Sequence, residues 1–314
     1  MTTMKLRIEA TAPFNGLPLI VAQEEGLFAK QGLEVEFMPV ENPLLTDLTL
    51  KDANQVSSSG GMHGGVFEQG GADLYNACEW GNYRRSSDSS HGARQIGRRA
   101  AVALGAIVVP PDSGVFTAQG LANKTIATPF HHGTHYLALQ LLEGFLRREE
   151  INLVSSGGRV ERYRSMMNST TDAATLTEPW ITIAQKAGCR VIVQSFYYGT
   201  DVASGTVDAE TTEAFQRAVS KAVKRINADK RSYLHYFIDY DWYTTPPQLG
   251  KVPPEVAALT VDDFDPANMQ FKDPAPVPDI DFQRTYEWMQ SWGLIEGGHD
   301  MSDLVENRVA GANS

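Results

Sequence analysis

Cysteine is scarce in this chain of 314 residues, which contains only Cys78 and Cys189. The two lie far apart and form no CxxC pair, so the sequence predicts neither a disulfide framework nor a zinc site built on cysteines. Long apolar runs are also missing. The longest, residues 100–109, is about half as long as a membrane-spanning helix, so we expect no membrane insertion.

Positive charge is in the minority, because 27 lysine and arginine residues stand against 38 acidic residues, for a formal net charge of −11. This balance argues against nucleic acid or an anionic membrane as the main partner. Charged residues interrupt every apolar run in residues 1–28 before an export signal could form. We therefore expect a cytoplasmic protein. A chain whose leader had been removed would look the same and would be periplasmic or extracellular.

Strand-like and helix-like runs alternate along the chain. In the first eighty residues, strands are predicted at 6–10, 33–38, 54–58 and 74–78, and helices at 17–28 and 66–70. A second such series covers 106–193, and a long amphipathic helix is predicted from residue 209. We interpret the polar stretch 84–99 as a surface loop near a domain crossing. The alternation predicts an α/β fold with mainly parallel sheets, which bind ligands beyond the carboxyl ends of their strands.

Histidine is concentrated at one predicted helix start. His131, His132 and His135 are three of only seven histidines, and they precede or begin the helix expected from Thr134. A helix start offers unpaired N–H groups and partial positive charge, which favour a carboxylate, sulfonate or phosphate. The alternative is that these histidines only cap the helix or lie at the surface. With His63 they could also hold zinc or iron, but the spacing is not HExxH, and we expect no metal.

Two further side chains are candidates for chemistry. His63 lies in the Gly-rich segment GGMHGG, and facing His132 or His131 it could act in general acid–base catalysis. Cys78 ends a predicted strand and could be a nucleophile if a neighbouring imidazole lowered its pKa, although a small buried cysteine is the commoner case. Arg162 and Arg164 could clamp an anion or lie on a solvated helix face.

Three phrases, PLIVAQEEGLFAKQGLEVEF, LANKTIATPFHHGTHYLALQLLEG and STTDAATLTEPW, resemble the NMT1/THI5-like group of the type 2 periplasmic-binding-protein superfamily. The resemblance covers roughly residues 5–295. It implies two α/β lobes, residues 1–83 plus 199–314 and residues 84–198, with crossings near Tyr83 and Tyr198 and a ligand cleft between them. The implied ligand-binding residues are Phe14, Asn15, Ser59, Gly60, Trp80, Tyr83, Phe130, His131, Gly133, Thr134, Arg162, Glu178, Trp180 and Tyr198.

The aromatic side chains at these cleft and hinge positions, with Tyr197, favour an aromatic or heterocyclic ligand. The mechanisms of two enzymes of this group cannot be carried over to this chain, however. The thiamine-pyrimidine synthase needs a lysine that carries pyridoxal phosphate, and this chain has no lysine between Lys51 and Lys124. The aromatic sulfinate desulfinase has its cysteine where this chain has Phe14 and Asn15. We therefore expect no cofactor.

We expect a cytosolic lyase that acts on a small cyclic or aromatic acid and removes a carboxyl or sulfinate group, as a decarboxylase or desulfinase does, by histidine acid–base chemistry in the cleft between the lobes. His63, His132 and Cys78 are its candidate catalytic residues. The alternative is a substrate-binding protein of an ABC importer for a small organic anion or aromatic compound. That protein would have a membrane permease as its partner.

Overall fold

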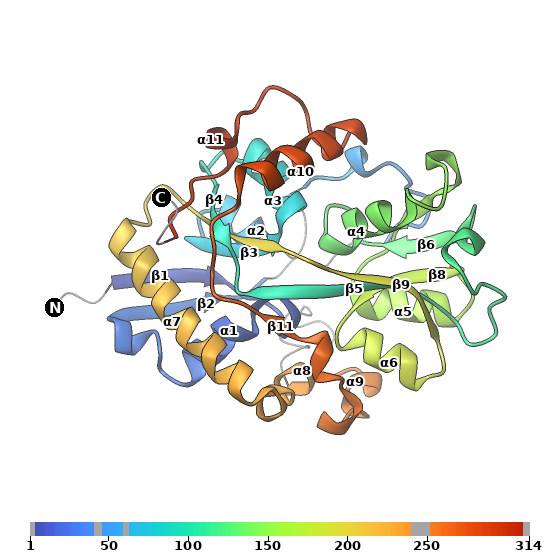
Figure 1. The fold of residues 1–314 in the computed structure, drawn as a ribbon, viewed down its shortest axis with the longest axis horizontal. Coiled ribbons are helices and arrows are strands. Elements are labelled where there is room, and N and C mark those ends of the chain that lie inside the picture. Colours follow the sequence, from blue (N-terminus) through green and yellow to red (C-terminus); the bar gives the residue numbers. More distant parts are fainter. Residues whose placement is uncertain (1–3, 41–45, 59–62, 240–251, 310–314) are drawn as a thin grey trace.

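The structure is a computed structural model that describes residues 4–40, 46–58, 63–239 and 252–309. Two β-sheets lie side by side along the long axis of the molecule, and helices pack around each of them (Figure 1). The molecule therefore has the two-lobe α/β architecture that the sequence predicted.

The first sheet has the strand order β2-β1-β3-β10-β4. Its strands are β1 (Met4–Glu9), β2 (Leu33–Met38), β3 (Leu74–Cys78), β4 (Arg94–Arg98) and β10 (Gly199–Ala203). The first three run parallel, and β10 is antiparallel to both of its neighbours. Every residue of β3 is buried, as expected for a central strand with helices on both faces. The helices of this lobe are α1 (Pro13–Glu24), α2 (Gly65–Glu68), α3 (Glu79–Asp88) and α7 (Ala209–Ala228).

The second sheet has the order β11-β5-β8-β6-β7, and β9 pairs with β5 as well. Its strands are β5 (Ala101–Val109), β6 (Thr125–Thr128), β7 (Asn152–Ser155), β8 (Ala173–Thr177), β9 (Arg190–Tyr197) and β11 (Gln270–Phe271). Around it lie α4 (Gly133–Leu142), α5 (Arg159–Met167), α6 (Trp180–Lys186), α8 (Tyr236–Asp239) and α9 (Pro254–Ala257). Near the C-terminus, α10 (Asp279–Ser291) and α11 (Met301–Leu304) return to α3 (Figure 1).

The chain passes from the first sheet to the second between β4 and β5, and it returns between β9 and β10 at Tyr198. The predicted boundary between residues 83 and 84 falls inside α3, and β4 pairs within the first sheet. The lobe limits 1–83 plus 199–314 and 84–198 stay a prediction. What the topology establishes is that both sheets direct carboxyl ends of parallel strands toward the space between them.

Two local predictions were wrong. Residues 54–58 form no strand, because the Asp52 carboxylate accepts the N–H of Asn54 and starts a short 3₁₀ helix, Ala53–Gln55. The stretch 84–99 is no surface loop but holds the end of α3 and all of β4. Several of its polar side chains are buried against polar groups: Arg85 donates to the His131 carbonyl, and the side-chain oxygen of Gln95 accepts from the Thr200 hydroxyl. Polar burial of this kind leaves no apolar periodicity to read.

Among the helices of the described residues, none combines the length and the apolar character needed to cross a bilayer.

Helix α7 contributes many side chains to the largest apolar cluster, and a substitution of Phe215 would test how much this packing stabilises the fold. Its ring is fully buried and stacks on Phe28 with centroids 5.9 Å apart. Truncation in Phe215→Ala should lower the free energy of unfolding by about 3–5 kcal/mol, because it removes buried area and leaves a cavity. Urea denaturation measures this. The exposed Lys221→Ala on the same helix is the control, and an equal loss in both variants would contradict this packing.

Candidate functional site

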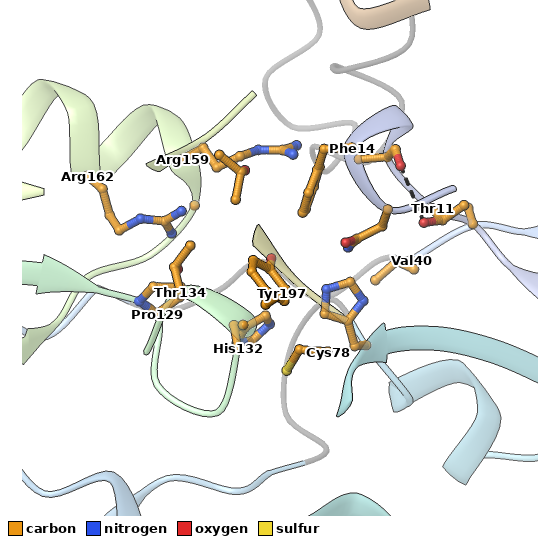
Figure 2. A pocket seen from close by; sticks show the side chains of 17 residues that line it. Thr11, Phe14, Val40, Cys78, Pro129, His132, Thr134, Arg159, Arg162 and Tyr197 are labelled. Atoms are coloured by element: carbon orange, nitrogen blue, oxygen red, sulfur yellow. Dashed lines mark hydrogen bonds between the residues drawn. The ribbon is translucent and has the colours of Figure 1, made fainter. Parts of the chain in front are cut away.

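A cavity of about 50 Å³ lies between the lobes, at the carboxyl ends of β1, β3, β6 and β8. Both lobes line it, as Figure 2 shows. The first lobe contributes Thr11, Phe14, Asn15, His63 and Cys78, and the second contributes Pro129, His132, Gly133, Thr134, Gly158, Arg159, Arg162, Thr177 and Tyr197. The cavity therefore lies beyond the carboxyl ends of parallel strands, where sheets of this kind bind ligands.

Three helix starts meet at this cavity, because α1, α4 and α5 each begin in its lining. In the described residues, none of the three has a side-chain hydrogen bond at its N-cap. The lack of a capping side chain leaves donor capacity and partial positive charge at the starts of α4 and α5. The start of α1 adds less, because Pro13 has no N–H and the N–H of Asn15 donates to the carbonyl of Ala12. At α4 the start is a glycine of necessity, since a Cβ on Gly133 would lie 2.5 Å from the Tyr197 ring. This geometry suits an anion.

Two arginines add full positive charge. Arg159 and Arg162 extend from the first turn of α5 toward the cavity (Figure 2). Arg162 is held by donating from Nε to the Thr175 carbonyl at 2.8 Å and from Nη1 to the Gly157 carbonyl at 2.7 Å. Its burial, aided by the charge of Arg159, lowers its pKa to about 9, so it stays cationic at neutral pH. The Arg159 guanidinium lies 4.8 Å from the ring centroid of Phe14 and so bridges the lobes.

The two histidines of the cavity are neutral. Burial, and then the charge of Arg85, lowers the pKa of His132 to about 3. Burial, and then His132 and three arginines, holds the pKa of His63 well below its usual value. The ring centroids of His63 and His132 lie 5.1 Å apart. The two rings, whose proximity the sequence analysis left open, are therefore neighbours in the structure, and both are uncharged imidazoles at neutral pH.

Cys78 lines the cavity as a thiol. Its Sγ accepts a hydrogen bond from the N–H of Gly81 at 3.3 Å, and burial raises its pKa. A thiolate is the reactive form of cysteine, and a raised pKa disfavours it. The geometry thus places Cys78 beside the histidines without activating it.

His131 supports the cavity from behind and does not line it. Its Nε2 lies 2.7 Å from the Ala53 carbonyl oxygen, its Nδ1 lies 3.2 Å from the Tyr136 hydroxyl, and its own carbonyl accepts from Arg85. Its φ of 60° is left-handed, a conformation that these contacts hold in place. Phe130 and His135 face a second, outer cavity of about 570 Å³ instead. The histidine loop is therefore a wall between two cavities.

Several predicted ligand residues are packed elsewhere. Trp80 packs against Tyr136 and Tyr197, and Trp180 against Tyr163. Tyr83 donates to Glu79 and contacts Phe282, Glu178 accepts from Thr182 and Asn268, and Tyr198 lies under Arg98. None of these five predicted residues lines the cavity. Ser59 and Gly60 lie outside the described residues.

Arg159 was missed by sequence reasoning, which named Arg162 and Arg164 instead. Arg164 is exposed and pairs with Glu255 at 2.8 Å, well suited to a solvated helix face. The rule of strand end and helix start would have found Arg159, because β7 is followed by the glycines at 157 and 158 and then by α5. Thr177 follows the same rule at the end of β8. Within the described residues, no group of three or more His, Cys, Asp and Glu side chains is placed to hold a metal ion.

No family model matches this chain, and no curated protein matches it either. Solved structures do. The alkanesulfonate-binding protein SsuA from Xanthomonas axonopodis pv. citri, bound to MOPS, is 15% identical with a TM-score of 0.69, over 98% of this chain and 99% of that one. The aliphatic sulphonate binding protein SsuA from Escherichia coli is 15% identical with a TM-score of 0.66, over 96% and 97%.

The desulfurization enzyme DSZB is similar as well, at 14% identity and a TM-score of 0.58, over 97% of this chain and 96% of that chain. These likenesses establish the periplasmic-binding-protein fold for this chain. The narrower NMT1/THI5-like assignment stays a prediction.

A buried acid below the cavity predicts a dependence of stability on pH. Burial raises the pKa of Asp201 to about 7 against the opposing effect of Arg99. The folded state therefore holds a proton that the unfolded state releases above pH 4, and stability should fall as the pH rises from 4 to 7. Asparagine does not titrate, so the variant Asp201→Asn should not lose stability in this way. The free energy of unfolding of the variant minus that of wild type should therefore increase by about 3–4 kcal/mol between pH 4 and pH 7. Chemical denaturation at several pH values measures the difference, and a constant difference would contradict the assignment.

Proposed function

We propose that this chain is a solute-binding protein for a small organic anion, which it holds between its lobes as the receptor component of an ABC importer. The observation that carries the proposal is the convergence of Arg159, Arg162 and three uncapped helix starts on one interlobe cavity. The sulfonate-binding neighbours support it. If this proposal is right, the protein acts in the periplasm and its partner is a membrane permease. The NMT1/THI5-like phrases would then place it in that group of the superfamily.

The size of the cavity favours a short aliphatic acid over the aromatic one expected from the sequence. A cavity of roughly 150 Å³ accommodates benzene, and this cavity measures about 50 Å³. Carboxylates, sulfonates and phosphonates with two or three carbons fit the charge and the size together. Thr134 and Thr177 supply hydroxyl groups beside the arginines for the remaining oxygens of such a headgroup.

A lyase of the decarboxylase or desulfinase type is the second candidate, and the neighbouring imidazoles of His63 and His132 are the observation that favours it. The likeness to the desulfurization enzyme points the same way. Against it stand the raised pKa of Cys78 and the low pKa of His132, since a general base works best with a pKa near the working pH.

The arginines provide the first test. Arg159→Gln and Arg162→Gln should each weaken the binding of ethanesulfonate or propionate by about 10- to 100-fold, because each removes a charge-assisted hydrogen bond to the anion. Isothermal titration calorimetry measures the affinity. The control is Arg164→Gln, which removes an exposed arginine from the same helix and should bind as wild type does. Equal affinity in all four proteins would contradict the proposal.

The lyase candidate is tested by turnover. A panel of short and aromatic carboxylates, sulfinates and sulfonates is incubated with wild type and with the His63→Ala, His132→Ala double variant. If the protein is a receptor, mass spectrometry should find every compound unchanged after long incubation with the compound in excess over the protein. Conversion of one compound by wild type alone would overturn the receptor proposal in favour of the enzyme.

A further inference from the structure

The hydrogen bonding of His132 defines which of its nitrogens is free. Its Nδ1 lies 2.9 Å from the carbonyl oxygen of Phe130. A carbonyl oxygen only accepts, so Nδ1 must carry the proton and donate it. Because the ring is neutral, Nε2 is then an acceptor with a bare lone pair. This atom is buried and has no hydrogen-bond partner among the described residues.

Two more polar atoms of the same lining share this condition. The side-chain oxygens of Asn15 and Thr177 are buried and have no partner in the described part of the chain. They flank the cavity from opposite lobes, Asn15 on α1 and Thr177 at the end of β8. A buried polar atom without a partner costs about 1–3 kcal/mol. Three such atoms around one cavity need polar partners, which a ligand bound in that cavity can supply.

The anion accounts for only part of this set. An anionic headgroup accepts hydrogen bonds, so it suits the arginines and the hydroxyl of Thr177. It cannot satisfy Nε2 of His132 or the side-chain oxygen of Asn15, because both atoms need a donor. An ammonium group is a poor donor here, because Arg85 and Arg162 already act on His132 and lower its pKa through their charge. A second cation would meet the same repulsion. An uncharged hydroxyl or amide N–H would not.

We infer that the ligand is a short organic acid that also carries an uncharged hydrogen-bond donor, a hydroxyl or an amide N–H, which donates to Nε2 of His132. The inference rests on the proposed anion-binding function and narrows its ligand class. Figure 2 shows the arrangement: Arg159 and Arg162 reach in from α5, and His132 lies at the opposite side of the lining, near Cys78. The acid group and the donor group of the ligand thus bind to residues on different sides of the cavity.

The test compares matched probes that differ only in the donor. Calorimetric titration is carried out with 2-hydroxyethanesulfonate, ethanesulfonate and 2-aminoethanesulfonate, and with 3-hydroxypropionate and propionate. The hydroxy acid of each pair should bind wild type about tenfold more tightly than its unsubstituted partner. The amino compound should bind more weakly than the hydroxy compound. The tenfold preference should be constant from pH 5 to pH 8, since His132 does not titrate in that range.

The variant His132→Phe removes the acceptor and keeps a ring of similar size, so it should bind both members of each pair equally. Thermal unfolding checks that the variant is folded, and its affinity for ethanesulfonate is the baseline against which the loss of the preference is measured. Binding of the anions without any preference in wild type, or a preference that survives in His132→Phe, would overturn the inference and leave the proposed function standing. If no probe binds wild type, the proposed function fails and the inference fails with it.

Discussion

Buried positive charge is the constraint on which the rest of this structure depends. Arg85, Arg99 and Arg162 are all buried near the interlobe cavity. Glu9 and Asp201 compensate Arg85 and Arg99 only in part, because burial raises the pKa of each of these two acids to about 7. Isolated charges are costly in a low-dielectric interior unless an opposite charge joins them. A bound anion would complete this arrangement, and the helix starts of α1, α4 and α5 act in the same direction.

The same charges link ligand binding to the way in which the two lobes contact each other. The cavity takes one wall from α1 and the others from α4 and α5, so an anion in it contacts both lobes at once. Contacts between the lobes already exist, since Arg159 lies over Phe14 and Arg85 donates to the carbonyl of His131. A ligand that binds the closed arrangement more tightly shifts the population toward it by that difference in affinity.

Sequence patterns located the site better than they located its residues. The rule that ligands bind beyond strand ends fits the position of the cavity, because that rule depends only on backbone topology. The resemblance implied Phe14 and Gly133, which line the cavity, but also Trp80, Tyr83 and Trp180, which do not, since their aromatic rings fit a core as well as a cleft. Sequence reasoning also failed at residues 84–99, where Arg85 and Gln95 are buried by pairing with distant polar groups. Such long-range pairing has no local signature, so it could not be predicted.

The pKa values of the cavity distinguish two uses of the same histidines. A general base must take a proton at the working pH, and its efficiency falls when its pKa is far below that pH. Burial, and then the charges of Arg85 and Arg162, lower the pKa of His132 to about 3. The charge of Arg162 thus favours an anion and at the same time weakens His132 as a base. A hydrogen-bond acceptor has the opposite requirement, because it must stay unprotonated at every pH at which it works. The charge that suits this cavity to an anion therefore suits His132 to recognition more than to proton transfer.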